Sequence, residues 1–216
     1  MSQTIVSSTS VTYAPVSSSF DSCTFYVGID GIRHKITGAR GSFSLNASVG
    51  EIPVISFTFT GIYNDPTDTA LPTCTYANQA DPVIFKNGNT TALQIFSYAA
   101  SLQSFSYDQN NETIYNEFVG GTKEILVTDR KPAGEAVIEA PALSAKNFFT
   151  TATGSATGNL TFQHGQTAGN KVTFTAGQID IASPAYTEEN GIQMLSLAYV
   201  ATPTSAGNNE ISLALT

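Results

Sequence analysis

The sequence contains no Trp, only two His and two Cys, and few charged side chains. Charged residues make up 12% of the chain, about half of the ~25% that is usual in soluble globular proteins. A coiled coil or helical bundle is excluded, because both need many Lys, Glu and Leu residues. Disorder of the whole chain is also excluded, since 41% of the residues are hydrophobic and include 13 Phe and 9 Tyr.

Positive charge is scarcer than negative charge. Nine Lys and Arg residues stand against 17 Asp and Glu residues, which gives a formal net charge of −8. The one basic cluster contains Arg33, His34, Lys35 and Arg40, and no Lys or Arg follows Lys171. Proteins that grip nucleic acid need clustered Lys and Arg against the phosphates. We therefore do not expect direct DNA binding, whereas an acidic surface that repels DNA fits the sequence.

Recognisable catalytic and metal-binding motifs are missing. His34 and His164 lie far apart in the sequence, and neither has a Cys or carboxylate at metal-ligand spacing. Residues 154–158 lack the spacing of a nucleophile elbow. Glu188 and Glu189 are adjacent, so on a strand they point to opposite faces and do not form a catalytic pair. We expect no enzyme, no cofactor and no metal site.

Signals for export and membrane insertion are not found either. Residues 1–10 have neither the basic nor the apolar region of a signal peptide. No apolar run approaches the ~20 residues of a membrane helix. Without an export signal, Cys23 and Cys74 are expected to be reduced. We expect a protein that is made and folded in a cytosol and is not inserted into a membrane.

What the sequence does contain is alternation of apolar and hydroxyl residues with a period of two, which is typical of β-strands. Residues 42–48 and 54–61 alternate in this way and are joined by Gly50-Glu51, which predicts a hairpin. Similar runs between Gly- and Asn-rich turns predict an all-β sandwich or barrel of about ten strands. The alternation slips at Ala176-Gly177, which predicts a bulge. The core is expected to include Ile55, Phe57, Phe59, Phe148 and Leu195.

One segment favours a helix, and two others differ from the strand pattern. A short flanking helix is predicted over residues 144–151, with Ser144 as its N-cap and Gly154 as its end. Residues 1–20 carry no charge and resemble an N-terminal arm, followed by a single domain over 21–216. Within this domain, residues 63–82 contain Pro66, Pro72 and Pro82 and predict a long loop.

Three blocks, taken together in their order and spacing, resemble the tail tube (major tail) proteins of tailed bacteriophages. Residues 38–63 are similar to the family's hairpin, in which a Gly-Glu turn and a Pro lead into an aromatic-hydroxyl strand. Residues 127–149 resemble its strand–turn–strand–helix element, and residues 169–215 resemble its last strands with the Gly-Asn-Asn-Glu turn. The resemblance covers about residues 38–216 and leaves out the first 30 residues and the 63–82 segment.

This resemblance implies a β-sandwich or barrel that assembles into rings and stacks into a tube. In the family the tube conveys double-stranded DNA from the capsid to the host, without specific binding, and encloses the tape-measure protein. Most members form hexamers, and a minority with duplicated domains form trimers; the sequence shows no clean internal repeat, which favours a hexamer. The expected partners are further copies of the chain, the tape-measure protein, the tail terminator and the distal tail proteins. The expected location is the virion tail, after synthesis in the host bacterial cytoplasm.

The resemblance and the charge pattern together suggest which residues act in assembly. Ser56, Thr58 and Thr60 are predicted to face the lumen, with solvent or a neighbouring strand as the alternative. Contacts between subunits are predicted at the following charged residues: Arg33, Lys35, Arg40, Asp65, Asp68, Glu188 and Glu189.

Two other functions stay open at this point. One is a monomeric carbohydrate-binding module, in which Tyr107 and residues 108–111 would contact a sugar. The absence of Trp argues against it, because sugar platforms rely on Trp. The other is a different tail ring protein on a related fold, such as a terminator or baseplate subunit.

Overall fold

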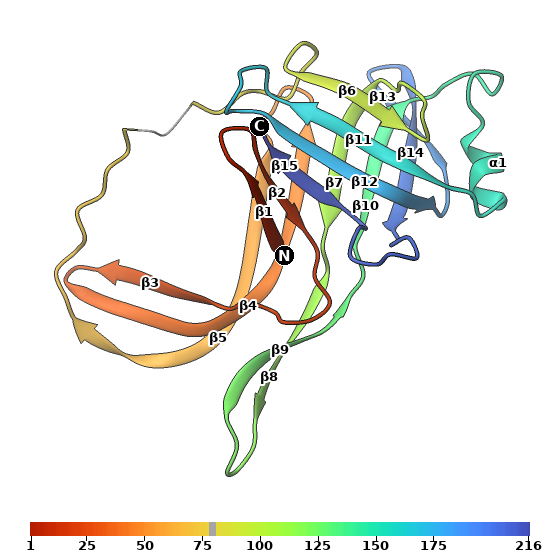
Figure 1. The fold of residues 1–216 in the computed structure, drawn as a ribbon. Coiled ribbons are helices and arrows are strands. Elements are labelled where there is room, and N and C mark those ends of the chain that lie inside the picture. The colour runs from red at the N-terminus through yellow and green to blue at the C-terminus, as the bar shows by residue number, and fades with distance from the viewer. Residues whose placement is uncertain (78–80) are drawn as a thin grey trace.

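The computed structural model describes residues 1–77 and 81–216, and it shows an almost entirely β protein (Figure 1). The elements, in chain order, are β1 (Ser2–Val6), β2 (Ser10–Ala14), β3 (Cys23–Ile29), β4 (Ile32–Ser48), β5 (Val54–Asp68), β6 (Thr90–Ile95), β7 (Leu102–Asp108), β8 (Asn111–Glu117), β9 (Lys123–Arg130), β10 (Ala133–Glu139), α1 (Phe148–Thr153), β11 (Thr157–His164), β12 (Val172–Ile181), β13 (Ala185–Glu189), β14 (Ile192–Ala201) and β15 (Ser212–Leu215). The predicted all-β class with one short helix is confirmed, with more strands than the ten expected.

Thirteen of these strands form one folded sheet, and β8 and β9 form a separate pair. The main path of the sheet is β1-β2-β15-β12-β14-β10-β7-β4-β3. Strand β5 is added beside β4, β13 beside β14, and β11 and then β6 beside β12. All of these neighbours are antiparallel, as is typical of chains with short connections.

The sheet folds over an aromatic core, which gives the molecule a sandwich-like body. Phe105 on β7 lies with its ring centroid 4.9 Å from those of both Phe162 on β11 and Phe174 on β12. These three rings therefore join the two layers of the sandwich. Of the residues predicted for the core, Phe148 and Leu195 are buried, with exposed fractions of 1% and 2%.

The other three residues predicted for the core are exposed, so that part of the prediction is wrong. Ile55, Phe57 and Phe59 have exposed fractions of 40%, 64% and 41%. They alternate with hydroxyl residues as the sequence indicated, but among the described strands β5 pairs with β4 alone and lies at an edge of the sheet, where these side chains are covered only in part.

The hairpin, the bulge and the helix lie where the sequence placed them, with differences at their ends. Gly50 has a φ of +89°, which suits a glycine in the turn between β4 and β5. The register between β11 and β12 shifts opposite Gly177, as the slip in alternation predicted. The N-cap of α1 is Asn147, three residues after the predicted Ser144. The Asn147 side chain accepts the hydrogen bond from the Thr150 N–H.

The N-terminal segment is not a free arm but a hairpin that joins the sheet. Strand β2 pairs with β1 on one side and with β15 on the other, from Val11 opposite Leu215 to Tyr13 opposite Leu213. All five residues of β1 are exposed, so β1 ends the sheet at this side. The hydroxyl-rich composition of this segment suits an exposed edge strand.

The predicted loop over residues 63–82 is shorter than expected at its start, because β5 continues to Asp68. The following residues 69–77 contain no strand or helix, and residues 78–80 lie outside the described part of the chain. After this connection the chain is hydrogen-bonded to the β4–β5 turn, because the Phe85 N–H donates to the Glu51 carbonyl at 2.8 Å. Phe85 itself is buried.

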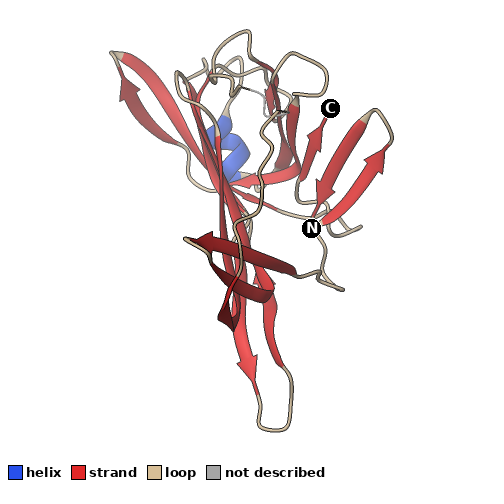
Figure 2. Ribbon diagram, turned by 90° about the vertical axis from the view of Figure 1, so that its left-hand side faces the viewer, coloured by secondary structure: helices blue, strands red, loops and turns tan. Residues whose placement is uncertain are grey.

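Two strand assemblies project from the sandwich (Figures 1 and 2). The first is the three-stranded extension, which consists of β3 with residues 32–37 of β4 and 62–68 of β5. The second is the β8–β9 hairpin, whose tip carries Phe118 with an exposed fraction of 68%. The alternation pattern does not single out this hairpin, because β8 is mostly polar on both faces.

We expect Phe105→Ala to lower the free energy of unfolding by about 3–5 kcal/mol, because it removes the ring that joins both layers. Phe57→Ala serves as the control and is expected to change it by less than about 0.5 kcal/mol, because that ring is exposed. Denaturant unfolding of the isolated subunit measures both values. Equal losses for the two variants would contradict this assignment of the core.

Candidate subunit interface

Strand β5 leaves one edge open along the full length of the molecule's longest hairpin. It pairs with β4 from Val54 opposite Asn46 to Asp68 opposite Ile32. In the described part of the chain no strand pairs with its other edge. Residues 54–60 are all exposed. An open edge of this length is a template for pairing with another chain, and folded proteins normally cover or interrupt such edges.

One face of β5 and of the extension is apolar, and we call it the aromatic face (Phe25, Ile36, Phe57, Phe59 and Tyr63). The register places Phe25, Ile36 and Tyr63 on adjacent strands directly across from one another. The ring of Phe59 lies 4.8 Å from Phe25 and 6.2 Å from Phe57, measured between centroids. Phe57 and Tyr63 have exposed fractions of 64% and 71%. A contiguous apolar patch of this kind marks an interaction site on a folded protein.

The opposite face of β5 is polar and almost free of charge. Ser56, Thr58 and Thr60 share this face and are all exposed, in agreement with the alternation of the sequence. In the register, Thr58 lies opposite Ser42 and Ser56 opposite Ser44, so hydroxyl groups continue onto β4. The structure brings the three predicted residues together; their position in a lumen stays a prediction.

The charged residues predicted for subunit contacts lie in two separate regions. Arg33 and Lys35 are on the extension, where they lie over the Tyr26 ring at 5.1 and 5.9 Å from its centroid. Asp65 and Asp68 are exposed on the same extension, at the end of β5.

Glu188 and Glu189 are exposed at the end of β13, far from the extension in Figure 1.

Comparison of the whole sequence with protein families finds a match to the family described as phage tail tube protein, over residues 1–207. The chain belongs to the phage tail tube protein family. The match includes the N-terminal hairpin and the 63–82 segment, which the sequence resemblance had left out. No curated protein matches the sequence. The family supports a structural role in the phage tail, and it suggests a protein that is not an enzyme.

The described residues of this tail tube protein offer no further site of a familiar kind. Within them, no three His, Cys, Asp or Glu side chains gather as a metal centre would need. The helix in residues 148–153 is short, and no helix in the described ranges has the length and apolar character of a membrane span.

Arg40 of the tail tube protein forms hydrogen bonds within its own subunit. Its guanidinium donates to the Phe20 carbonyl at 2.8 Å and to the Ile125 carbonyl. It thereby connects β4 to β9 and to the chain segment before β3. A contact of Arg40 with another subunit stays a prediction.

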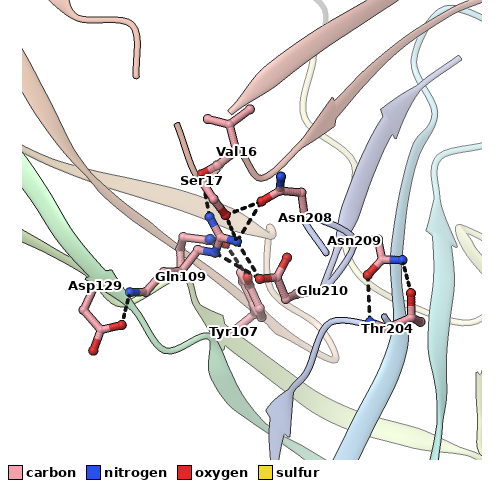
Figure 3. Close-up of polar contacts among 10 residues, drawn as sticks. Val16, Ser17, Tyr107, Gln109, Asp129, Thr204, Asn208, Asn209 and Glu210 are labelled. Atoms are coloured by element: carbon pink, nitrogen blue, oxygen red, sulfur yellow. Dashed lines mark hydrogen bonds and ion pairs between the residues drawn. The ribbon is translucent and has the colours of Figure 1, made fainter. Parts of the chain in front are cut away.

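Arg130 forms a second internal connection, which sequence analysis missed (Figure 3). Its guanidinium forms an ion pair with Glu210 at 2.5 Å and donates to the Val16 carbonyl at 2.7 Å. Asn208 and Ser17 complete the cluster, which joins the base of β9, the segment after β2 and the chain before β15. The side chains of Arg130 and Glu210 are only 14% and 6% exposed, so the pair is largely shielded from water.

Tyr107 lies beside this cluster and is buried (Figure 3). Burial raises the pKa of its phenol, and the nearby Glu210 carboxylate raises this pKa further. The phenol therefore stays protonated and donates to the Gln109 side-chain oxygen. No sequence motif singles out Arg130 or Glu210, because their partners are spread over residues 16–17 and 208–210.

We expect Glu210→Ala to destabilise the subunit by about 3–5 kcal/mol, because it leaves the Arg130 charge buried without a counter-ion. Lys131→Ala is the control, since the ion pair of Lys131 with Asp129 is exposed and its removal should leave stability nearly unchanged. Thermal and denaturant unfolding of both variants test this. A Glu210→Ala subunit as stable as the unmodified protein would contradict the structural role of the pair.

Proposed function

We propose that this protein assembles into hexameric rings that stack into the phage tail tube, the conduit through which double-stranded DNA leaves the capsid. The observation that carries the proposal is the open edge and exposed aromatic face of β5. Family membership supports the structural role, and the surface of β5 supports assembly from identical copies.

The physical argument for assembly is that β5 cannot remain uncovered at high concentration. Its edge offers unpaired backbone groups, and the side chains of Phe57 and Phe59 extend the apolar surface outward from the core. A second copy that pairs with this edge satisfies the backbone groups and buries the rings. In the proposed ring the β5 edge pairs with a different surface of the next copy, and such heterologous contacts close into a ring when the rotation between neighbours closes.

We further propose that Ser56, Thr58 and Thr60 line the lumen of the ring. Once the aromatic face is buried between subunits, this hydroxyl face remains on the opposite side of the same strand. Ser56, Thr58 and Thr60 themselves carry no positive charge that would hold phosphate. Six copies at −8 each give a ring of −48, which disfavours adhesion of DNA to the wall and lets it slide.

The remaining parts of the proposal follow from this role. The tape-measure protein would occupy the tube before DNA release, and the tail terminator and distal tail proteins would bind its two ends. A single sandwich without an internal repeat fits six identical subunits better than three duplicated ones. The protein would be made in the host bacterial cytoplasm and reside in the virion tail.

The alternative of a carbohydrate-binding module loses support. Tyr107 and Gln109, which would have formed the sugar platform, are buried with exposed fractions of 1% each. The tail terminator or baseplate alternative has no specific feature of the structure in its favour.

We expect Phe57→Ser to abolish ring and tube formation while the subunit stays folded, because Phe57 is exposed in the subunit and buried in the proposed interface. Phe57→Leu retains an apolar side chain and should still assemble. Negative-stain electron microscopy and sedimentation of concentrated protein measure the outcome. Tubes of normal abundance from Phe57→Ser would contradict the proposed interface.

A cysteine at position 58 tests the lumen assignment. In a Cys23→Ser and Cys74→Ser background, Thr58→Cys should react with both small and polymer-linked maleimides in the isolated subunit. After assembly it should react with the small reagent and become largely protected from the large one, because a large reagent can reach the lumen of a long tube only through its two ends. Equal reaction with the large reagent before and after assembly would place this face on the outside.

A further inference from the structure

The extension carries a cationic patch (Tyr26, Arg33 and Lys35) for which the described residues supply no counter-ion. Register places Lys35 opposite Tyr26, and Arg33 opposite Gly28, so all three side chains share one face. In the described part of the chain, no carboxylate oxygen lies within 4.0 Å of either cation. Asp68 does not neutralise the patch, because it lies opposite Ile32 on the other face.

Most other cations of this protein are already engaged inside the subunit. Lys123, Arg130 and Lys131 form ion pairs, and Arg40 and Lys146 donate to backbone carbonyls.

The cationic patch differs because two like charges are held side by side on one ring. Arg33 is half-buried, and its Nε atom is shielded from solvent without a hydrogen-bond acceptor. Adjacent like charges destabilise each other, and a carboxylate from outside the subunit would remove this repulsion.

A complementary surface exists at the end of β13. Glu189 is exposed there and Glu139 is exposed at the end of β10, and no Lys or Arg nitrogen of the described residues lies within 4.0 Å of either carboxylate. Glu189 and Glu139 line a pocket of about 230 Å³ between β7, β10 and the β13–β14 turn. The Glu189 carboxylate is oriented by a hydrogen bond from the Gln103 amide at 2.7 Å. A pocket of this size with two carboxylates fits the end of a cationic side chain.

The two surfaces cannot meet within one subunit. Figure 1 shows the extension and β13 at opposite ends of the molecule. Since the surfaces differ from one another, a contact between them joins two copies head to tail, as ring closure requires.

We propose that the cationic patch of one subunit docks against Glu139 and Glu189 of a second copy of this chain. This inference rests on the proposed function, because it names the charged contact that sets the register of neighbouring subunits. The aromatic face contributes apolar burial, and the charged contact selects the correct alignment.

Charge exchange tests the contact. The Arg33→Glu and Lys35→Glu double variant should raise the protein concentration needed for tube formation by at least about tenfold, because like charges then face each other. The Glu139→Lys and Glu189→Lys double variant should do the same. The variant with all four changes should restore assembly to near the unmodified level, since the attraction is then only reversed. The onset of light scattering and electron microscopy measure assembly.

A matched control separates this contact from an effect of net charge. Lys86 and Lys171 also have no carboxylate within 4.0 Å among the described residues, and Lys86→Glu with Lys171→Glu changes the net charge by the same amount. This control should assemble near the unmodified concentration. Equal inhibition by the control, or failure of the four-residue variant to restore assembly, would overturn the docking proposal.

The same experiment separates this inference from the proposed function. If the unmodified protein forms tubes and the charge exchange has no effect, only the docking contact is wrong. If the unmodified protein and every variant stay monomeric at all concentrations, the self-assembly on which the inference rests is wrong, and the inference fails with it.

Discussion

The length of β4 is the constraint on which the rest of the structure depends. This single strand of 17 residues belongs to two assemblies, because its second half pairs with β7 in the sandwich and its first half pairs with β3 in the extension. Strand β5 follows it on the other side throughout. The candidate interface is therefore not a flexible appendage. It is a continuation of the core sheet, and Phe43 in the core is 6.3 Å from the exposed ring of Phe57.

Two arginines among the few cations stabilise the subunit from within. Arg40 and Arg130 donate hydrogen bonds from the bases of the projecting elements to backbone carbonyl groups, and Arg130 also pairs with Glu210. Both arginines are partly buried. Within the described residues, the side chains of Arg33 and Lys35 have no such acceptors, although they are close to Arg40 in the sequence. The basic cluster of the sequence thus contains residues in different environments, because they lie at different positions along β4.

Much of the fold could be predicted because it depends on local patterns. The all-β class, the hairpin around Gly50, the helix before Gly154 and the bulge at Gly177 follow from alternation and from residues with special backbone preferences. The N-terminal hairpin was missed because its strands are short and rich in hydroxyl residues, and β8 was missed because most of its positions are polar. Arg130 and Glu210 were missed because the pair joins residues that are 80 positions apart.

The candidate interface on β5 depends on strand pairing, which local sequence patterns do not determine. Alternation in β5 determined by itself that Phe57 and Phe59 share one face and that Ser56, Thr58 and Thr60 share the other. It did not determine whether a second layer covers the apolar face, since that depends on which strands pair and how far the sheet extends. The tertiary structure decided this. Because β5 lies at an edge outside the sandwich, the side chains of Phe57 and Phe59, which the alternation assigned to the core, are exposed and available to a neighbouring subunit.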